Sequence, residues 1–306
     1  MKLGVRWPDF EVPIDRGVVH TFVQAVDDLG FDHITAFDHL AGMSSRTRRG
    51  WRMDYMNDKQ WAESLTLLSH MSGLSDRLGF MTAILGLPNR PTVLVAKQVA
   101  TIDRMCEGRL RLGVGLGWND IEFAISGNSF EDRAERMEEQ VEVLRQLWTK
   151  EEVSFRGDFH RLPAIGLSLT PVQQPIPIWM AATMASGPKV LRRIARLADG
   201  VIPEWPPGDE AREKMAFIFE EARKVGRDPA EIGAEPKIAL RAGAHRAGTD
   251  QGGMKADEEL AAEVAQWQEI GVTHVEFKSR SCGLVTIEEH LREASRFKEI
   301  ADSVLC

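Results

Sequence analysis

Asp38 and His39 are adjacent residues whose types suit acid–base chemistry. They follow an apolar run at residues 32–37 that predicts a strand, so both side chains should emerge where that strand ends. An imidazole titrates near neutral pH and an adjacent acid can shift its pKa, which makes His39 the strongest candidate for moving a proton. The alternative interpretation is a loop histidine bonded to backbone.

A glycine-rich stretch at residues 108–119 could hold a flat or phosphorylated ligand. Its apolar residues alternate as in a buried strand. Its glycines fall where that strand should leave the core, at Gly113, Gly115 and Gly117. Without side chains there, a planar ring or a phosphate can lie against backbone N–H groups. The alternative interpretation is that the glycines only relieve crowding where strands converge.

The sequence lacks other familiar catalytic patterns. Its eight histidines include no H-E-x-x-H pattern and no clustered ligands, so we expect no metal site. No G-x-S-x-G elbow occurs, which argues against a serine hydrolase. The three cysteines form no C-x-x-C pair, so neither a disulfide framework nor a zinc ribbon is indicated.

Composition narrows the class further. A chain with 43% hydrophobic and 27% charged residues is typical of a globular protein of enzyme size. The formal charge of −8 argues against nucleic acid as a partner, because neutralising phosphates needs clustered Lys and Arg. No apolar run approaches the roughly 20 residues of a membrane span, and residues 1–6 lack a signal peptide's apolar segment. We expect a cytoplasmic protein that acts on a small molecule, without a membrane partner.

The elements that position these residues alternate between short apolar runs and amphipathic stretches. Strands are predicted near residues 2–7, 32–37, 78–87, 110–115, 177–182, 200–204, 236–244 and 272–278. Helices are predicted near residues 15–30, 61–68, 92–107, 132–148, 187–199, 209–225, 257–270 and 286–304. A Gly157-Asp158 turn within 153–162 predicts an inserted hairpin.

Eight strand–helix units favour a (β/α)₈ barrel, in the α/β class, over an open doubly wound sheet. A dinucleotide-binding sheet would need G-x-G-x-x-G at its first strand–helix turn, whereas the glycines here lie on the fourth strand. No linker or low-complexity tract divides the chain, so we expect one domain over residues 1–306. In such a barrel the chemistry belongs at the carboxyl ends of the strands.

Residues 90–105, running into residues 108–118, resemble the bacterial luciferase-like monooxygenase superfamily, whose enzymes use flavin or deazaflavin. Further similarity lies in Glu122-Phe123, in residues 175–179 and in Ala198-Asp199-Gly200. The resemblance implies a (β/α)₈ barrel, usually a homodimer, with the tricyclic cofactor ring in the barrel mouth.

The resemblance also implies cofactor-binding residues. The ring site maps to Thr82, Ala83, Ile84, Gly115, Leu116, Gly117 and Trp118. A non-prolyl cis peptide is expected between Ala83 and Ile84. The phosphate site maps to Ala182, Thr183, Ser186 and Gly187 at a helix start, where N–H groups bind anions, with Arg133 as a further cation. Simple helix capping is the alternative for Thr183 and Ser186, and a surface ion pair is the alternative for Arg133.

Two details favour the deazaflavin coenzyme F420 over FMN. Bacterial luciferases place an arginine near the phosphate at the position of Leu116, and this chain has none there. The Asp38-His39 pair and the Gly-Leu-Gly-Trp sequence are more similar to the F420-dependent members. The implied reaction is hydride transfer between cofactor and a small organic substrate, with His39 moving the proton and Asp38 orienting the imidazole. An FMN-dependent monooxygenase and a non-catalytic flavin-binding protein are the alternatives.

The loop at residues 42–54 carries Arg46, Arg48, Arg49 and Arg52. Because loops at this face of a barrel often bind ligands, it could be a lid whose cations hold an anionic substrate or the acidic tail of the deazaflavin. A solvated loop is the alternative.

Overall fold

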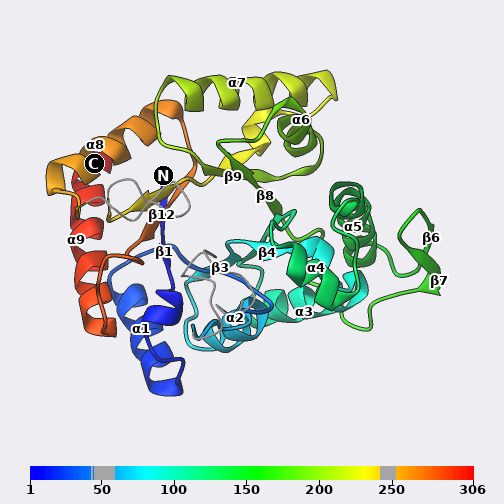
Figure 1. Ribbon diagram of the computed structural model, residues 1–306, viewed down its shortest axis with the longest axis horizontal. Coiled ribbons are helices and arrows are strands. Elements are labelled where there is room, and N and C mark those ends of the chain that lie inside the picture. The colour runs from blue at the N-terminus through cyan, green and yellow to red at the C-terminus, as the bar shows by residue number, and fades with distance from the viewer. Residues whose placement is uncertain (43, 45–58, 242–252) are drawn as a thin grey trace.

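The strands of the protein form a closed parallel ring surrounded by helices (Figure 1). The computed structural model describes residues 1–42, 44, 59–241 and 253–306, so the predicted lid lies almost wholly outside the described residues. The ring contains β1 (Lys2–Arg6), β2 (His33–Ala36), β3 (Gly79–Thr82), β5 (Leu110–Gly115), β8 (Ile178–Thr183), β9 (Gly200–Glu204), β10 (Gly233–Ala234), β11 (Lys237–Ala239) and β12 (His274–Lys278).

The ring closes through residues 233–239. The strand order is β10-β9-β8-β5-β3-β2-β1-β12-β11, and neighbouring strands are parallel. β10 pairs with β9, and β11 pairs with β12, so one short stretch of chain bridges both ends of the sheet. Because β10 and β11 together occupy one strand position, between β9 and β12, the ring has eight strand positions. The predicted (β/α)₈ fold is confirmed.

Helices cover the outside of the ring (Figure 1). They are α1 (Arg16–Asp28), α2 (Ser64–Ser72), α3 (Thr92–Met105), α4 (Asp120–Ser126), α5 (Arg133–Thr149), α6 (Pro188–Leu197), α7 (Asp209–Lys224), α8 (Asp257–Ile270) and α9 (Ile287–Leu305). Local signals set their ends. Asp15 caps α1 by accepting from the Val18 N–H, and Thr286 with Glu289 forms a capping box on α9. None of the helices in the described ranges is both long and apolar enough to cross a membrane.

Two predicted strands differ from the structure, and one helix was not predicted. The predicted strand 78–87 is interrupted after Thr82, contains a cis peptide between Ala83 and Ile84, and resumes as β4 (Leu85–Gly86). The predicted strand 236–244 begins earlier, at Gly233, and its second part ends at Ala239. Helix α4 was not predicted, because its seven residues are too few to give a clear helical period. The expected hairpin is present as β6 (Val153–Arg156) and β7 (Arg161–Ile165), at the molecule's edge beyond α5 (Figure 1).

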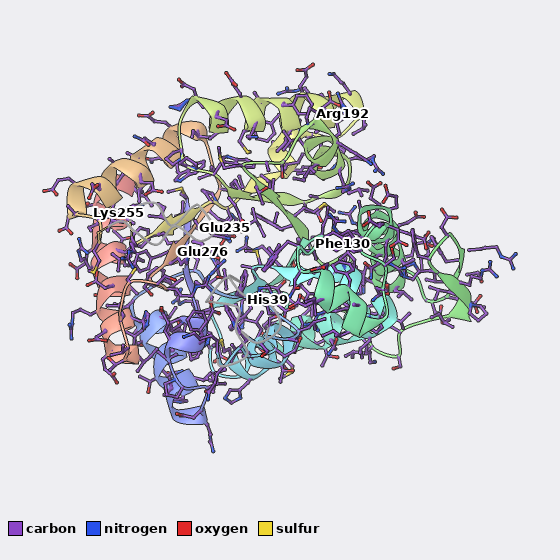
Figure 2. All side chains as sticks on the ribbon, in the orientation of Figure 1. His39, Phe130, Arg192, Glu235, Lys255 and Glu276 are labelled. Carbon is purple, nitrogen blue, oxygen red and sulfur yellow. The ribbon has the colours of Figure 1, made fainter. Side chains whose placement is uncertain are left out.

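The interior of the ring has an apolar part and a charged part. A small apolar cluster contains Met81, Ala83, Trp179 and Ile202, separate from the main core between strands and helices. Between the neighbouring strands β1 and β12, Arg6 Nε lies 2.8 Å from Glu276 Oε1, with both side chains almost fully buried. Figure 2 shows Glu235 and Glu276 within the ring of strands. Side chains therefore fill the ring below its mouth, as in a barrel core.

Candidate active site

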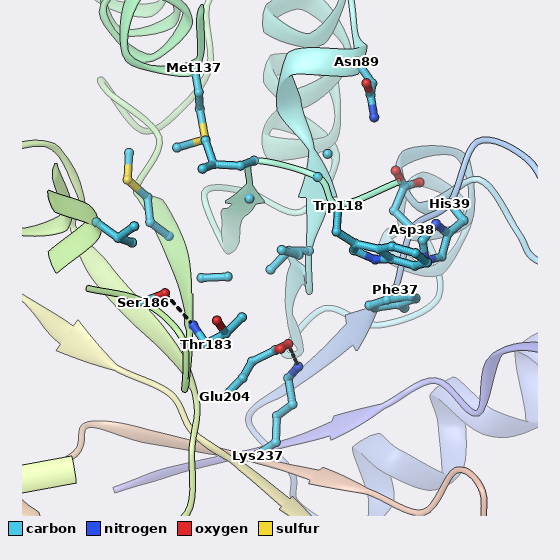
Figure 3. Close-up of a pocket in the computed structure, with 18 of the residues that line it drawn as sticks. Phe37, Asp38, His39, Asn89, Trp118, Met137, Thr183, Ser186, Glu204 and Lys237 are labelled. Carbon is cyan, nitrogen blue, oxygen red and sulfur yellow. Dashed lines mark hydrogen bonds and ion pairs between the residues drawn. The ribbon is translucent and has the colours of Figure 1, made fainter. Parts of the chain in front are cut away.

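A cavity of about 430 Å³ opens at the carboxyl ends of the strands (Figure 3). Most of the strands, and helices α4, α5 and α6, contribute to its lining. Phe37, His39 and Trp118 lie on one side of the view and Thr183 and Ser186 lie on the other, so the cavity spans the barrel mouth. The position agrees with where a (β/α)₈ barrel is expected to carry its chemistry.

His39 lines this cavity, and its ring nitrogen Nδ1 contacts the carboxylate of Glu122. Its Nδ1 lies 2.8 Å from Glu122 Oε1, which also accepts a hydrogen bond of 3.1 Å from the Leu40 N–H. Both side chains are buried, with 7% and 8% exposure. Because a carboxylate accepts hydrogen bonds, this geometry assigns the imidazole proton to Nδ1 and leaves Nε2 as the basic nitrogen.

Aromatic rings surround the imidazole. The ring centroids of Phe37, Trp61 and Trp118 lie 5.1, 5.5 and 5.9 Å from that of His39, each with its plane steeply inclined to the imidazole. We call these three residues the aromatic wall. Edge-to-face packing of this kind is favourable and holds the imidazole at one orientation. His39 is thus fixed by a hydrogen bond on one nitrogen and by packing on its faces.

Asp38 lines the same cavity, but its carboxylate contacts Arg90 and Ser64 instead of the imidazole of His39. Arg90 Nη2 lies 2.9 and 2.8 Å from its two carboxylate oxygens, and the Ser64 N–H donates to it at 3.2 Å. Asp38 therefore ties the segment after β2 to the start of α2 and to Arg90. The expectation that Asp38 orients His39 is wrong, because the carboxylate that contacts the imidazole is that of Glu122.

The residues expected to hold the cofactor ring divide into two groups. Ile84, Gly115, Leu116, Gly117 and Trp118 line the cavity. Two others do not. Thr82 Oγ1 donates to the Gly113 carbonyl at 2.7 Å, and the Ala83 carbonyl accepts from Arg6 Nη2 at 3.0 Å. Thr82 and Ala83 therefore lie beneath the surface that a ring could touch.

The glycines of β5 have close neighbours. A Cβ atom on Gly113 would lie 1.9 Å from the Thr82 carbonyl oxygen, and one on Gly115 would lie 2.2 Å from Ile84 Cδ1. Gly117 has a φ of +75°, which L side chains rarely adopt. The structure thus supports the packing interpretation at Gly113 and Gly115, although Gly115 also lines the cavity.

The far side of the cavity has the donors of an anion site. The Thr183 N–H donates to Ser186 Oγ at 2.9 Å, and both residues line the cavity (Figure 3). Gly187 caps the start of α6 behind them, and Ala182 is buried in β8 with 1% exposure. Hydroxyls beside the N–H groups of a helix start suit a phosphate.

Arg133 does not line the cavity. Its Nη1 donates to the Phe130 carbonyl at 2.5 Å, and its guanidinium carbon lies 3.6 Å from the centre of the Phe130 ring. Arg193 on α6 is one of the cations that line the cavity together with Thr183 and Ser186. Nothing in its local pattern marks it, because its burial depends on how α6 packs.

The remaining wall of the cavity is charged. The Lys237 ammonium forms an ion pair with Glu204 and holds the pKa of that carboxyl below its ordinary value. Arg280 also lines the cavity, and its Nη1 lies 2.9 Å from Asp9 Oδ2. Sequence reasoning missed Lys237, Arg280 and the contact of Glu122 with His39, since the partners of these side chains lie far away in the chain. No cluster able to hold a metal ion occurs among the residues that the structure describes.

The chain matches the family described as luciferase-like monooxygenase over residues 14–269. The chain belongs to this family. The match covers most of the ring and its helices, and it confirms the resemblance seen in residues 90–118. As a luciferase-like protein, the chain is an enzyme of the oxidoreductase type.

Two relatives are similar to part of this chain. An uncharacterized protein of Mycobacterium tuberculosis is 30% identical over 210 residues, covering 69% of this chain and 67% of its own length. A protein of Nakamurella multipartita named F420-dependent glucose-6-phosphate dehydrogenase is 30% identical over 185 residues, covering 58% of this chain and 49% of that protein. The match therefore spans about half of that relative.

Solved structures share the fold at lower identity. Monooxygenase RslO1 from Streptomyces bottropensis superimposes with a TM-score of 0.81 at 19% identity, and each chain is fully covered. An F420-dependent secondary alcohol dehydrogenase, solved with an F420–acetone adduct, gives a TM-score of 0.78 at 19% identity over 99% of this chain and 98% of that one. Both share the barrel fold of this chain.

Proposed function

We propose that this luciferase-like protein is an F420-dependent oxidoreductase that transfers a hydride between the cofactor and a small organic substrate. The observation that carries the proposal is one cavity with His39, held by Glu122, on one side and the Thr183–Ser186 donors at the start of α6 on the other. The names of two comparison proteins, both F420-dependent dehydrogenases, support this cofactor and point to alcohols as substrates to test.

The residues present fit such a cofactor. The apolar cluster around Met81 and Ile202, with Ile84 and Ala181 packed on it, offers a surface for a flat ring. Ile84 and Ala181 also line the cavity, so this surface faces the open space. Thr183, Ser186 and the α6 N–H groups would take the phosphate. When bound, a deazaflavin supplies two-electron hydride chemistry.

The chain's own part in the reaction is proton movement and positioning. His39 Nε2 would accept the proton of a substrate hydroxyl, or return it to a carbonyl oxygen in the reverse direction. Glu122 would stabilise the imidazolium that forms, because it hydrogen-bonds Nδ1. The aromatic wall would exclude water from the reacting atoms, which strengthens these polar contacts.

FMN is the competing cofactor. The description of the family and the name of RslO1 support monooxygenase chemistry, whereas the absence of an arginine at Leu116 favours F420. Titration of the purified protein with FMN and with F420, followed by fluorescence, tests the choice. We expect tighter binding of F420, followed by turnover of F420 with alcohols. Tighter binding of FMN would favour the monooxygenase, and binding without turnover would favour a non-catalytic flavin-binding protein.

The proposal extends to the oligomeric state and the cellular location of the protein. We propose a homodimer in the cytoplasm with a small-molecule substrate and no nucleic-acid partner, following the resemblance and the charge of −8. Light scattering of the purified protein tests the dimer, and a monomeric mass at micromolar concentration would contradict it.

A further inference from the structure

Arg193 is a buried cation inside the cavity, on the side of the anion-binding donors. It lies on α6 with 4% exposure and lines the cavity together with Thr183, Ser186 and Val190. Its Nε donates to Glu138 Oε1 at 2.7 Å. Among the described residues, its two terminal nitrogens donate no hydrogen bond to protein atoms. A guanidinium has five N–H donors, so most of its donor capacity is left for a ligand.

The position of Arg193 on α6 brings its charge toward the helix start. Arg193 is five residues after Pro188, or about 7 Å along the helix axis. Helical side chains lean toward the N-terminus, and an arginine is long enough to span that distance. Arg193 lines the same cavity as Thr183 and Ser186. The helix start and Arg193 present positive potential to the same space.

Glu138 orients this arginine without cancelling the local charge. The same carboxylate also forms an ion pair with Arg196, so two guanidinium groups share one carboxylate. Burial opposes ionisation of Glu138, but hydrogen bonds from both arginines outweigh it and hold its pKa below the ordinary value. The group of three keeps a net positive charge. A buried cation of this kind is stable when an anion completes its hydrogen bonds.

We infer that Arg193 binds the phosphate group of the flavin or deazaflavin cofactor, as the cation that this chain uses in place of an arginine at Leu116. The inference rests on the proposed function, because it assigns a residue to the cofactor of the same site. It adds a cationic ligand to a phosphate site otherwise built from hydroxyls and backbone N–H groups.

The test compares cofactors with and without phosphate. Dissociation constants are measured by fluorescence for F420 and FMN and for their phosphate-free counterparts, a deazaflavin riboside and riboflavin. We expect Arg193→Met to weaken binding of the phosphorylated cofactors at least tenfold and to change binding of the phosphate-free ones less than twofold. Arg193→Lys should recover part of the loss, because it restores the charge but not the planar fork.

Arg192→Met is the matched control, since Arg192 lies on the same helix, is 58% exposed and pairs with Glu221 at 3.1 Å (Figure 2). It should leave all four constants unchanged. If Arg193→Met does not fold, Arg193→Gln keeps size and polarity and serves in its place. An equal loss for both kinds of cofactor, or no loss, overturns the inference. If the wild-type chain binds neither F420 nor FMN, the proposed function fails as well, so the two failures are distinguishable.

Discussion

At the scale of single residues, the imidazole of His39 is defined by a carboxylate 83 positions later in the sequence. Glu122 comes from α4, which begins directly after the glycine-rich stretch and is capped by Asn119. The aromatic wall adds a second constraint on the imidazole. Asp38 has a different task, because it ties the segment that carries His39 to Arg90 and α2. Asp38, the acid next to His39 in the sequence, is therefore not the acid that contacts the imidazole, which is Glu122.

His39→Ala should reduce turnover by about 10²- to 10⁴-fold, the range that general acid–base groups contribute. Binding of F420 should change less than threefold, because His39 lies across the cavity from the Thr183–Ser186 donors. Steady-state kinetics and cofactor titration measure the two effects separately. Unchanged turnover would refute the assignment of His39.

Glu122→Gln should lower kcat about tenfold or more with little effect on KM, because the amide still reaches His39 but no longer stabilises an imidazolium. Glu131→Gln, at an exposed acidic position before α5, is the control and should behave as wild type. An unchanged kcat, or a loss that appears in KM alone, would contradict a role of Glu122 through His39.

At the scale of elements, β5 shows how packing places the site. Its glycines let the chain approach β3 and β4 closely, and the space at Gly115 is filled by Ile84. Ile84 follows the Ala83–Ile84 cis peptide and is itself a residue of the cavity surface. The glycine-rich stretch thus forms the floor of the cavity through its neighbours as well as through its own backbone.

Gly113→Ala should destabilise the protein by about 2 kcal/mol or more, because overpacking that forces a backbone shift costs at least 1–3 kcal/mol. The obstacle is the Thr82 carbonyl, a backbone atom that cannot rotate away. Gly73→Ala is the comparison, since Gly73 has a φ of −84° and its nearest neighbour atom is at an ordinary 3.7 Å. Urea unfolding of both variants measures the difference. Equal stability of the two would show that β3 and β5 can separate without cost.

At the scale of the whole molecule, the barrel interior ends in a charged layer at the amino ends of the strands. Glu235 lies 2.5 Å from both His33 Nε2 and Arg111 Nη1. Burial disfavours its charge, but the charge of Arg111 and the contact with His33 outweigh burial and hold the pKa of Glu235 far below its ordinary value. Burial, with the charge of Arg111 nearby, lowers the pKa of His274 to about 3. His274 is therefore neutral in the folded protein over the usual working range of pH.

These shifts predict a loss of stability in acid. Between pH 6.5 and about 3 the unfolded chain protonates His274 while the folded chain does not, so the free energy of unfolding falls as pH falls. The lowered pKa of Glu235 acts in the same direction below about pH 4.5. His274→Asn should therefore lessen the loss between pH 7 and pH 5 by about 1–2 kcal/mol. Urea unfolding at the two pH values measures it.

Another buried group opposes this trend. Burial raises the pKa of Glu11 to about 7, so its contribution to stability increases as pH falls from 7 toward 4.5. The comparison of His274→Asn with wild type removes this term, because Glu11 is present in both. An identical pH dependence in the two proteins would contradict the role given to His274.

The sequence by itself determined the order of strands and helices, the hairpin and the position of His39 at a strand end. These features are local, because period, caps and turn residues act within a few positions of each other. These local signals did not predict the interruption after Thr82, whereas the family resemblance correctly placed a cis peptide between Ala83 and Ile84. The apolar run continues through the break, and a periodicity argument cannot detect it.

Tertiary structure alone decided which side chains meet. The pairing of β1 with β12, the contact of Glu122 with His39 and the place of Arg193 in the cavity join residues far apart in the chain or depend on how a helix packs. The closing of the ring fixes strand register, and register determines which side chains point inward at the same height. The local sequence does not specify that register, so contacts between side chains on different strands can be identified only from the folded ring.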